Sequence, residues 1–174
     1  PASDSCGLTR HSSDMQNLTI EWAARIPMRD GVKLSAKIYR PKNASPSPAL
    51  FTMTPYGLDI EHPDAFYFVR QGFAVVIADS RGRGDSEGTF IADYVDIEDG
   101  PDAVEWIAQQ PWCNGKVGMY GGSYTGQNQW LTLRSFPPHL KTIVPAKSAH
   151  LAHDYVFRGP IKWTHIWFWN VLTN

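Results

Sequence analysis

The stretch KVGMYGGSYTGQ, at residues 116–127, decides the fold of this chain. Residues 116–120 predict a short strand, and residues 125–135 predict a helix that ends at two consecutive prolines. Ser123 lies between them, at the turn from strand to helix. A serine at a sharp strand-to-helix turn is typical of a nucleophile elbow. The pattern therefore predicts that Ser123 is a catalytic nucleophile.

The residues around Ser123 suit a nucleophile on a strained turn. Gly121 and Gly126 are small enough to let the strand and the helix approach each other closely. Because a helix N-terminus favours negative charge, the backbone N–H of Tyr124 is the expected donor to an oxyanion. The usual five-residue motif has glycine where this chain has Thr125. Taken alone, the motif also fits a plain glycine-rich turn, and the strand and helix around it favour the elbow.

Strands and helices alternate along the rest of the chain. Near-continuous apolar runs predict strands buried on both faces, and periodic runs with stop residues predict helices. The predicted strands are 49–54, 73–78, 116–120 and 142–146, and the predicted helices are 65–71, 96–110 and 125–135. Alternation at 18–22 and 32–38, around an Asp-Gly turn at 30–31, predicts a β-hairpin. We therefore predict an α/β fold with a mostly parallel sheet, helices on both faces, and an antiparallel hairpin at one edge.

The composition narrows the class of function. The chain has 174 residues, 43% of them hydrophobic, and a formal net charge of -1. This near-neutral charge argues against nucleic acid as a partner, and no apolar run approaches the roughly 20 residues that span a bilayer. We expect a soluble protein without a membrane partner, and both a cytoplasmic and a secreted location stay open. The cysteines and histidines show no ligand spacing, so we expect no metal and no organic cofactor.

A glycine-rich loop follows the strand predicted at 73–78. Its Gly-Arg-Gly, residues 82–84, resembles the start of a dinucleotide-binding fingerprint. Glu87 stands where the third glycine is required, and no helix begins there, so we reject a nucleotide site. We expect the loop to brace the sheet through an ion pair of one arginine with one aspartate, Arg81 or Arg83 with Asp79 or Asp85.

Several further stretches occur in a familiar order: MRDGVKL at 28–34 with YRP at 39–41, TPYG at 54–57, ADSRGRGDSEG at 78–88, EWI at 105–107 and PWCNGKVG at 111–118. Together with the elbow they resemble the X-Pro dipeptidyl-peptidase and cocaine-esterase family, which includes α-amino-acid ester hydrolases and cephalosporin acylases. The resemblance runs from about residue 25 to 147 and implies an α/β-hydrolase fold. In this family the elbow reads Gly-x-Ser-Tyr-x-Gly, so Thr125 is no departure from the pattern.

The resemblance also implies a role for Tyr56. In the family a tyrosine hydroxyl at this position is the second oxyanion donor, beside the backbone N–H that follows the nucleophile. The residues agree with this role, because Tyr56 follows directly on a buried strand, at the carboxyl end where sites in parallel sheets lie. The alternative is a tyrosine that fills the rim of the core.

The acid and base of a serine triad do not follow Ser123 at a suitable place. In α/β hydrolases the order is Ser, then Asp or Glu, then His, and Asp154 followed by His165 has this order. Their spacing is short, and the resemblance places both where a helical cap domain begins. We therefore expect the acid and the histidine to come from the remainder of the hydrolase, in the same or a second chain. The chain then looks like an N-terminal fragment that is inactive alone.

The chain divides into three expected parts. Residues 1–16 are polar and form a loose arm, residues 17–147 form the N-terminal part of the catalytic domain, and residues 148–174 begin the cap. The last part contains Trp163 and Trp167 in an apolar run that needs a partner to cover it. We expect these two tryptophans to contact substrate, and the rest of the hydrolase, in the same or a second chain, to cover the run. A homo-oligomer also stays open.

The expected reaction is hydrolysis of a small-molecule ester, or amide, through an acyl-enzyme intermediate, as in a cocaine-esterase-like carboxylesterase. An X-Pro dipeptidyl peptidase and a β-lactam or α-amino-acid ester acylase share this front half and remain alternatives. The peptidases bind a substrate amino terminus through acidic groups, and no such cluster can be placed in this chain, which favours the esterase. A non-catalytic, hydrolase-like binding module is the alternative of another class.

Overall fold

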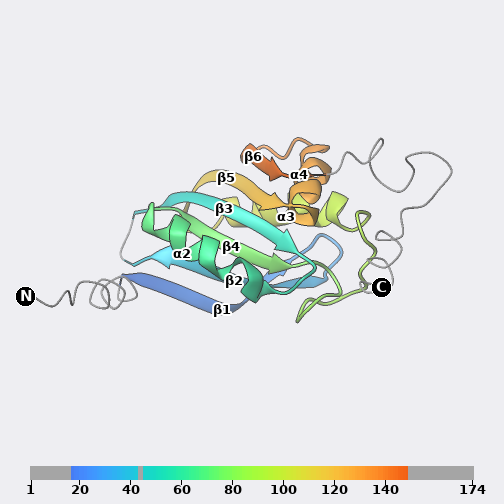
Figure 1. Cartoon of the computed structure of the whole chain (residues 1–174), viewed down its shortest axis with the longest axis horizontal. Helices are drawn as coiled ribbons and strands as arrows, with labels where there is room; N and C mark the ends of the chain where they lie inside the picture. Colours follow the sequence, from blue (N-terminus) through green and yellow to red (C-terminus); the bar gives the residue numbers. More distant parts are fainter. Residues whose placement is uncertain (1–16, 43–44, 149–174) are drawn as a thin grey trace, which may run out of the picture.

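The computed structural model describes residues 17–42 and 45–148, which form one six-stranded sheet with helices against it (Figure 1). The expected arm at 1–16 and the expected cap from residue 149 onward lie outside the described residues. The elements in chain order are β1 (Leu18–Pro27), β2 (Lys33–Pro41), β3 (Ser47–Thr54), η1 (Leu58–Glu61), α2 (His62–Arg70), β4 (Ala74–Asp79), α3 (Asp96–Ala108), β5 (Cys113–Gly122), α4 (Tyr124–Leu133) and β6 (Leu140–Ala146).

The strand order across the sheet is β1-β2-β4-β3-β5-β6. Strands β3, β4, β5 and β6 run parallel, whereas β2 is antiparallel to β4 and β1 is antiparallel to β2. The predicted parallel sheet with an antiparallel hairpin at its edge is therefore confirmed. Gly31 turns the hairpin with a φ of 88°, a conformation that glycine adopts without a steric penalty.

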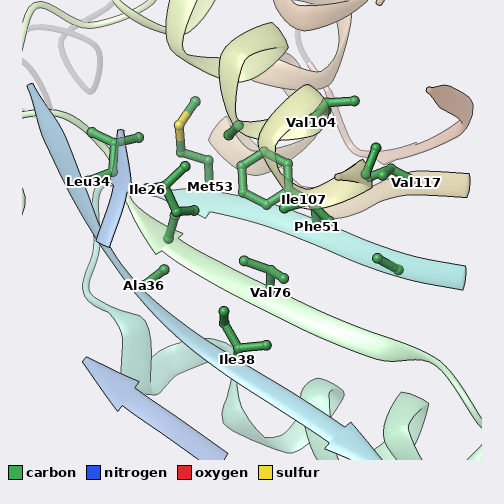
Figure 2. Close-up of a cluster of buried hydrophobic side chains, with 14 of the residues drawn as sticks. Ile26, Leu34, Ala36, Ile38, Phe51, Met53, Val76, Val104, Ile107 and Val117 are labelled. Atoms are coloured by element: carbon green, nitrogen blue, oxygen red, sulfur yellow. The ribbon is translucent and has the colours of Figure 1, made fainter. Parts of the chain in front are cut away.

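One face of the sheet carries the larger hydrophobic cluster, which Figure 2 shows. Phe51 and Met53 of β3 lie on this face with Val104 and Ile107 of α3, and all four are fully buried. Phe51 and Met53 share this face because every second residue of a strand points to the same face of its sheet. Helix α3 therefore packs against this side of the sheet with one apolar face.

The opposite face carries the second cluster, which is built around α2. The residues of this cluster are Tyr39, Leu58, Ala65, Val69, Val75, Ile77 and Tyr120. All six residues of β4 are buried, and the first five, residues 74–78, alternate between the two clusters. A strand covered on both faces needs apolar side chains throughout, which explains the continuous apolar run in the sequence.

Two elements, α2 and β5, begin three residues earlier than the sequence predicts. Helix α2 starts at His62 instead of residue 65, with Pro63 in its first turn, where a missing backbone N–H does no harm. Strand β5 starts at Cys113 instead of residue 116. Gly115 has a φ of 79°, so this strand bends locally, and Asn114-Gly115 has the sequence of a turn.

The glycine-rich loop is held by partners other than those predicted. Arg81 donates from Nε and Nη2 to the two carboxylate oxygens of Asp99, at 2.9 and 2.6 Å, and from Nη1 to Asp30, at 2.5 Å. Its guanidinium therefore ties the hairpin turn to α3. The hydrogen bonds to Asp99 and then to Asp30 raise the pKa of Arg81, so its charge is permanent.

The predicted pairing with Asp79 or Asp85 is wrong. The guanidinium of Arg83 lies 4.3 Å from the centroid of the Phe90 ring, a cation–π contact. Asp79 is 3% exposed, and among the described residues one of its carboxylate oxygens has no hydrogen-bond partner. Burial raises the pKa of Asp79 to about 6. Burial disfavours the charged form of this carboxyl, so Asp79 binds a proton more readily than an exposed aspartate does.

Replacing Arg81 by methionine is expected to lower the free energy of unfolding by about 3 kcal/mol. The Asp99 side chain is 1% exposed, so removal of Arg81 leaves a carboxylate buried without its counter-ion. Arg29→Met is the matched control, because Arg29 makes a similar forked contact with Asp102 while its side chain is 55% exposed, and less than about 1 kcal/mol is expected there. Urea denaturation measures both, and equal losses would contradict the interpretation.

Candidate active site

Ser123 occupies the turn that the sequence predicts. It separates β5 from α4 and has φ 57° and ψ -120°, a strained backbone conformation for a residue with a side chain. Its N–H donates to the carbonyl of Ala146, at 3.0 Å, and its carbonyl accepts from the N–H groups of Gly126 and Gln127, at 3.1 and 2.9 Å. The strained residue is thus held from both sides, and its side chain remains exposed at the carboxyl end of the parallel strands.

The glycines around Ser123 are required by close approach. A Cβ atom at Gly121 would lie 2.7 Å from Cβ of Thr125, and one at Gly126 would lie 2.9 Å from the carbonyl oxygen of Ala146. Thr125 is 2% exposed and donates from its hydroxyl to the carbonyl of Gly122, at 2.9 Å. Position 125 therefore holds a side chain that caps the strand, which explains why it needs no glycine.

Gly121→Ala is expected to lower the free energy of unfolding by about 3 kcal/mol, because overpacking adds to backbone strain. Gly121 has a φ of 141° and no room for a Cβ atom. Gly72→Ala is the matched control, since Gly72 has a φ of 91° but nothing within 4 Å of the added atom. Only the strain of about 1 kcal/mol should be lost there. Thermal or urea unfolding compares the two variants. An equal loss of stability would show that the close contact of the added Cβ atom at residue 121 has no extra cost.

Tyr56 stands at the carboxyl end of β3, as the sequence predicts. Its backbone N–H donates to the hydroxyl oxygen of Thr54, at 3.1 Å, and Thr54 is fully buried. The Tyr56 side chain is 41% exposed, and its ring meets the Tyr124 ring edge to face, with centroids 6.3 Å apart at 74°. The structure therefore brings the predicted hydroxyl donor next to the residue that follows Ser123.

The side chain of Tyr124 is buried under the elbow. Its hydroxyl donates to Oδ2 of Asp96, the first residue of α3. Burial raises the pKa of Tyr124, so the phenol keeps its proton, and burial likewise raises the pKa of Asp96 to about 7. Sequence reasoning missed Asp96, since an aspartate in a first helical turn ordinarily faces solvent.

Neither histidine of the described residues can serve Ser123 as a base. His139 directly precedes β6, at the amino end of the parallel strands, and its Nδ1 lies 2.6 Å from a carboxylate oxygen of Glu105. His62 contacts Asp59, and also Tyr39, which belongs to β2. Strands β4 and β3 separate β2 from β5, the strand that leads to Ser123. With about 4.8 Å between neighbouring strands, that separation is on the order of 14 Å. Asp154, His165, Trp163 and Trp167 lie outside the described residues.

A cavity of about 470 Å³ lies next to the loop before α3. Its lining is part apolar and part charged: Asp30, Arg81, Thr89, Ile91, Tyr94, Val95, Ile97, Glu98 and Asp99. Ser123 and Tyr56 do not line it, so it is not the site of the predicted chemistry. Within the described residues, no group of three or more His, Cys, Asp or Glu side chains could hold a metal ion. The helices of this part of the chain include no candidate membrane-spanning segment.

The sequence of this chain matches known proteins. The family model for X-Pro dipeptidyl-peptidase (S15 family) matches residues 30–173. Cocaine esterase of Rhodococcus sp. (strain MB1 Bresler) is 38% identical over 150 residues, which are 83% of this chain and 26% of that protein.

Solved structures show the same relationship. A CocE/NonD family hydrolase from Staphylococcus aureus superposes with a TM-score of 0.83 at 28% identity, over 90% of this chain and 32% of that one. An α-amino acid ester hydrolase superposes with a TM-score of 0.69 at 28% identity, over 86% of this chain and 27% of that one. The chain spans between a quarter and a third of the length of these relatives. It has part of an α/β-hydrolase fold and belongs to the X-Pro dipeptidyl-peptidase (S15) family, whose members are hydrolases.

Proposed function

We propose that this chain is the nucleophile-bearing, N-terminal portion of a serine hydrolase that cleaves carboxylic esters through an acyl-enzyme intermediate. Ser123 is the nucleophile, and the Tyr56 hydroxyl and the Tyr124 backbone N–H hold the oxyanion. The observation that carries the proposal is the strained backbone of Ser123, with φ 57°, at a strand-to-helix turn in a member of this family. Such strain is retained where it exposes a reactive side chain.

The reaction proceeds in two halves. The Ser123 hydroxyl oxygen attacks the ester carbonyl carbon while its proton passes to a histidine base, and the carbonyl oxygen becomes an oxyanion. The tetrahedral intermediate collapses, and the alcohol leaves with that proton. Water then attacks the acyl-enzyme by the same route and releases the carboxylic acid and the free serine. The oxyanion forms twice, so both donors act in both halves.

The base and its acid partner come from beyond the described residues, in the remainder of the hydrolase. Strand β6 supports this view, because within the described sheet it pairs with β5 alone and Val144 on it is 59% exposed. An exposed strand edge beside the nucleophile is suited to pairing with further strands. Alone, the chain is then inactive, with Ser123 a poorly activated hydroxyl. We propose that Trp163 and Trp167, also outside the described residues, contact the acyl group.

An ester is favoured over a peptide for two reasons. Cocaine esterase is among the relatives, at 38% identity. A peptidase that reads a free amino terminus needs carboxylates that can pair with an ammonium group. Two described carboxylates that contact the first turn of α4 have other partners, since Asp96 accepts from Tyr124 and Asp93 accepts from Gln127.

The test is active-site labelling followed by a substrate panel, both with the full-length protein that contains this chain. A fluorophosphonate probe should label one peptide, and mass spectrometry should place the label on Ser123. Short-chain aryl esters should then give a higher kcat/KM than X-Pro anilides. A label on another serine would refute the nucleophile, and faster anilide cleavage would replace the esterase with the peptidase. No label and no turnover would support a non-catalytic binding module.

A further inference from the structure

Tyr124 has a side-chain group to which the proposed reaction gives no role. Its phenol is 4% exposed, donates to Oδ2 of Asp96, and accepts a hydrogen bond from the backbone N–H of Asp93, at 3.2 Å. A buried hydroxyl with both a donor and an acceptor contact has a defined orientation. The ring of the residue that follows the nucleophile is therefore fixed at its far end.

The partners of this phenol are themselves held in place. Asp93 has a φ of 65°, a left-handed backbone conformation that aspartate tolerates better than most residues with a side chain. The Asp93 carboxylate accepts from Nε2 of Gln127 on α4, at 2.6 Å, and Gln127 is 3% exposed. Asp96 is fully buried at the start of α3. The loop before α3 is thus fastened to the first turn of the nucleophile helix on both sides of the phenol.

The ring of Tyr124 connects this network to Tyr56. Its centroid lies 6.3 Å from that of Tyr56 in an edge-to-face contact, and 6.1 Å from that of Phe90. Tyr56 is 41% exposed, so the described residues leave much of its ring open to solvent. A movement of the Tyr124 ring would displace the surface against which the Tyr56 ring stands.

We propose that the Tyr124 phenol is a positioning group for the oxyanion hole. Its hydrogen bonds with Asp96 and Asp93 fix the Tyr124 ring. The backbone N–H of Tyr124 is the first oxyanion donor, and the Tyr124 ring supports Tyr56, whose hydroxyl is the second. The inference rests on the proposed function, since it explains the fixed orientation of the Tyr124 side chain by a role in that reaction. Preorganised donors stabilise an oxyanion because they need not reorient during the reaction.

The experiment is a double-mutant cycle in the full-length enzyme, with an aryl ester as substrate. Tyr124→Phe keeps the ring and the backbone N–H and removes only the hydroxyl. We expect kcat to fall about tenfold, short of the roughly hundredfold that a misplacement near 1 Å can cause, while KM stays unchanged. In a Tyr56→Phe background the same change should have a clearly smaller effect, since one of the two donors it positions is gone.

Tyr120→Phe is the matched control. Tyr120 lies on β5, is 7% exposed, and its hydroxyl has no hydrogen-bond partner among the described residues. Its removal should leave kcat unchanged. Wild-type kcat in Tyr124→Phe, or an equal loss with and without the Tyr56 hydroxyl, would overturn the inference while Ser123 labelling leaves the proposed function intact. A wild-type enzyme that is never labelled at Ser123 would overturn both.

A second variant keeps the inference testable if Tyr124→Phe does not fold. Gln127→Met removes the amide that holds Asp93 and preserves the length and the helix propensity of the side chain. We expect a smaller fall in kcat, again without a change in KM. A kcat equal to that of the wild type would overturn the inference, because loosening a partner of the phenol would then have no effect on the oxyanion hole.

Discussion

Ser123→Ala is expected to lower kcat for ester hydrolysis on the order of 10⁶-fold in the full-length enzyme, the scale of a lost serine nucleophile. The alanine removes the oxygen that forms the acyl-enzyme in the proposed reaction, while the two proposed oxyanion donors stay in place. KM should change little, because the missing oxygen forms its bond during the reaction and contributes little to ground-state binding. Steady-state kinetics with an aryl ester, together with loss of fluorophosphonate labelling, measures the effect.

A matched serine tests whether the loss is chemical. Ser135→Ala changes an exposed serine just beyond the other end of α4, whose hydroxyl donates to the carbonyl of Thr132 at 3.3 Å. We expect wild-type kcat and full labelling from this variant. Persistent turnover in Ser123→Ala, with labelling intact, would mean that another residue attacks the carbonyl. Equal losses in both variants would instead indicate damage to the helix.

Most of the fold could be predicted because its signals are local. Each residue of β4 is buried, and its continuous apolar run has few other structural explanations. The elbow could be predicted for the same reason, since a strand, a glycine-flanked serine and a helix follow one another within about 20 residues. The boundaries failed at Pro63 and Gly115, which the sequence uses inside elements although both residue types commonly end them.

The contacts that span the fold could not be predicted in the same way. Arg81 and Asp30 are 51 positions apart, and Tyr124 and Asp96 are 28 apart. Sequence proximity favoured Asp79 and Asp85 as arginine partners, but a turn with glycines at φ 70° and 50° carries the chain away from that pairing. Strand order decides which carboxylates lie beside a guanidinium, and a local sequence pattern does not specify the strand order.

The residues of the candidate site likewise differ in whether a local sequence signal predicts them. Ser123 and the backbone N–H of Tyr124 follow from one motif, and Tyr56 follows from a resemblance that covers most of the chain. The second layer around them has no motif at all. Asp93 and Asp96 stand in the acidic stretch IADYVDIEDG at residues 91–100, which has four acidic residues that the sequence alone does not distinguish. Only the folded chain shows that the buried Asp96 accepts the hydrogen bond of the Tyr124 phenol.

Tyr56→Phe is expected to lower kcat for ester hydrolysis about 10²- to 10³-fold, the usual effect of losing one oxyanion donor. The phenylalanine keeps the ring contact with Tyr124, whose centroid is 6.3 Å away, and the backbone hydrogen bond to Thr54, so the loop should not move. KM should change little, because the hydroxyl binds the oxyanion more strongly than the ground-state carbonyl. Steady-state kinetics and pre-steady-state acylation bursts measure the loss.

Tyr67→Phe provides the comparison for this change. Tyr67 lies on α2 and is 60% exposed, so this variant makes the same chemical change at a solvent-facing position. Its kcat should match that of the wild type. The ratio between the two variants isolates the part of the loss that belongs to the oxyanion. A Tyr56→Phe enzyme with wild-type kcat would remove Tyr56 from the reaction and leave it as a rim residue of the core. A rise in KM with constant kcat would make it a binding residue, since uniform binding changes KM without changing kcat.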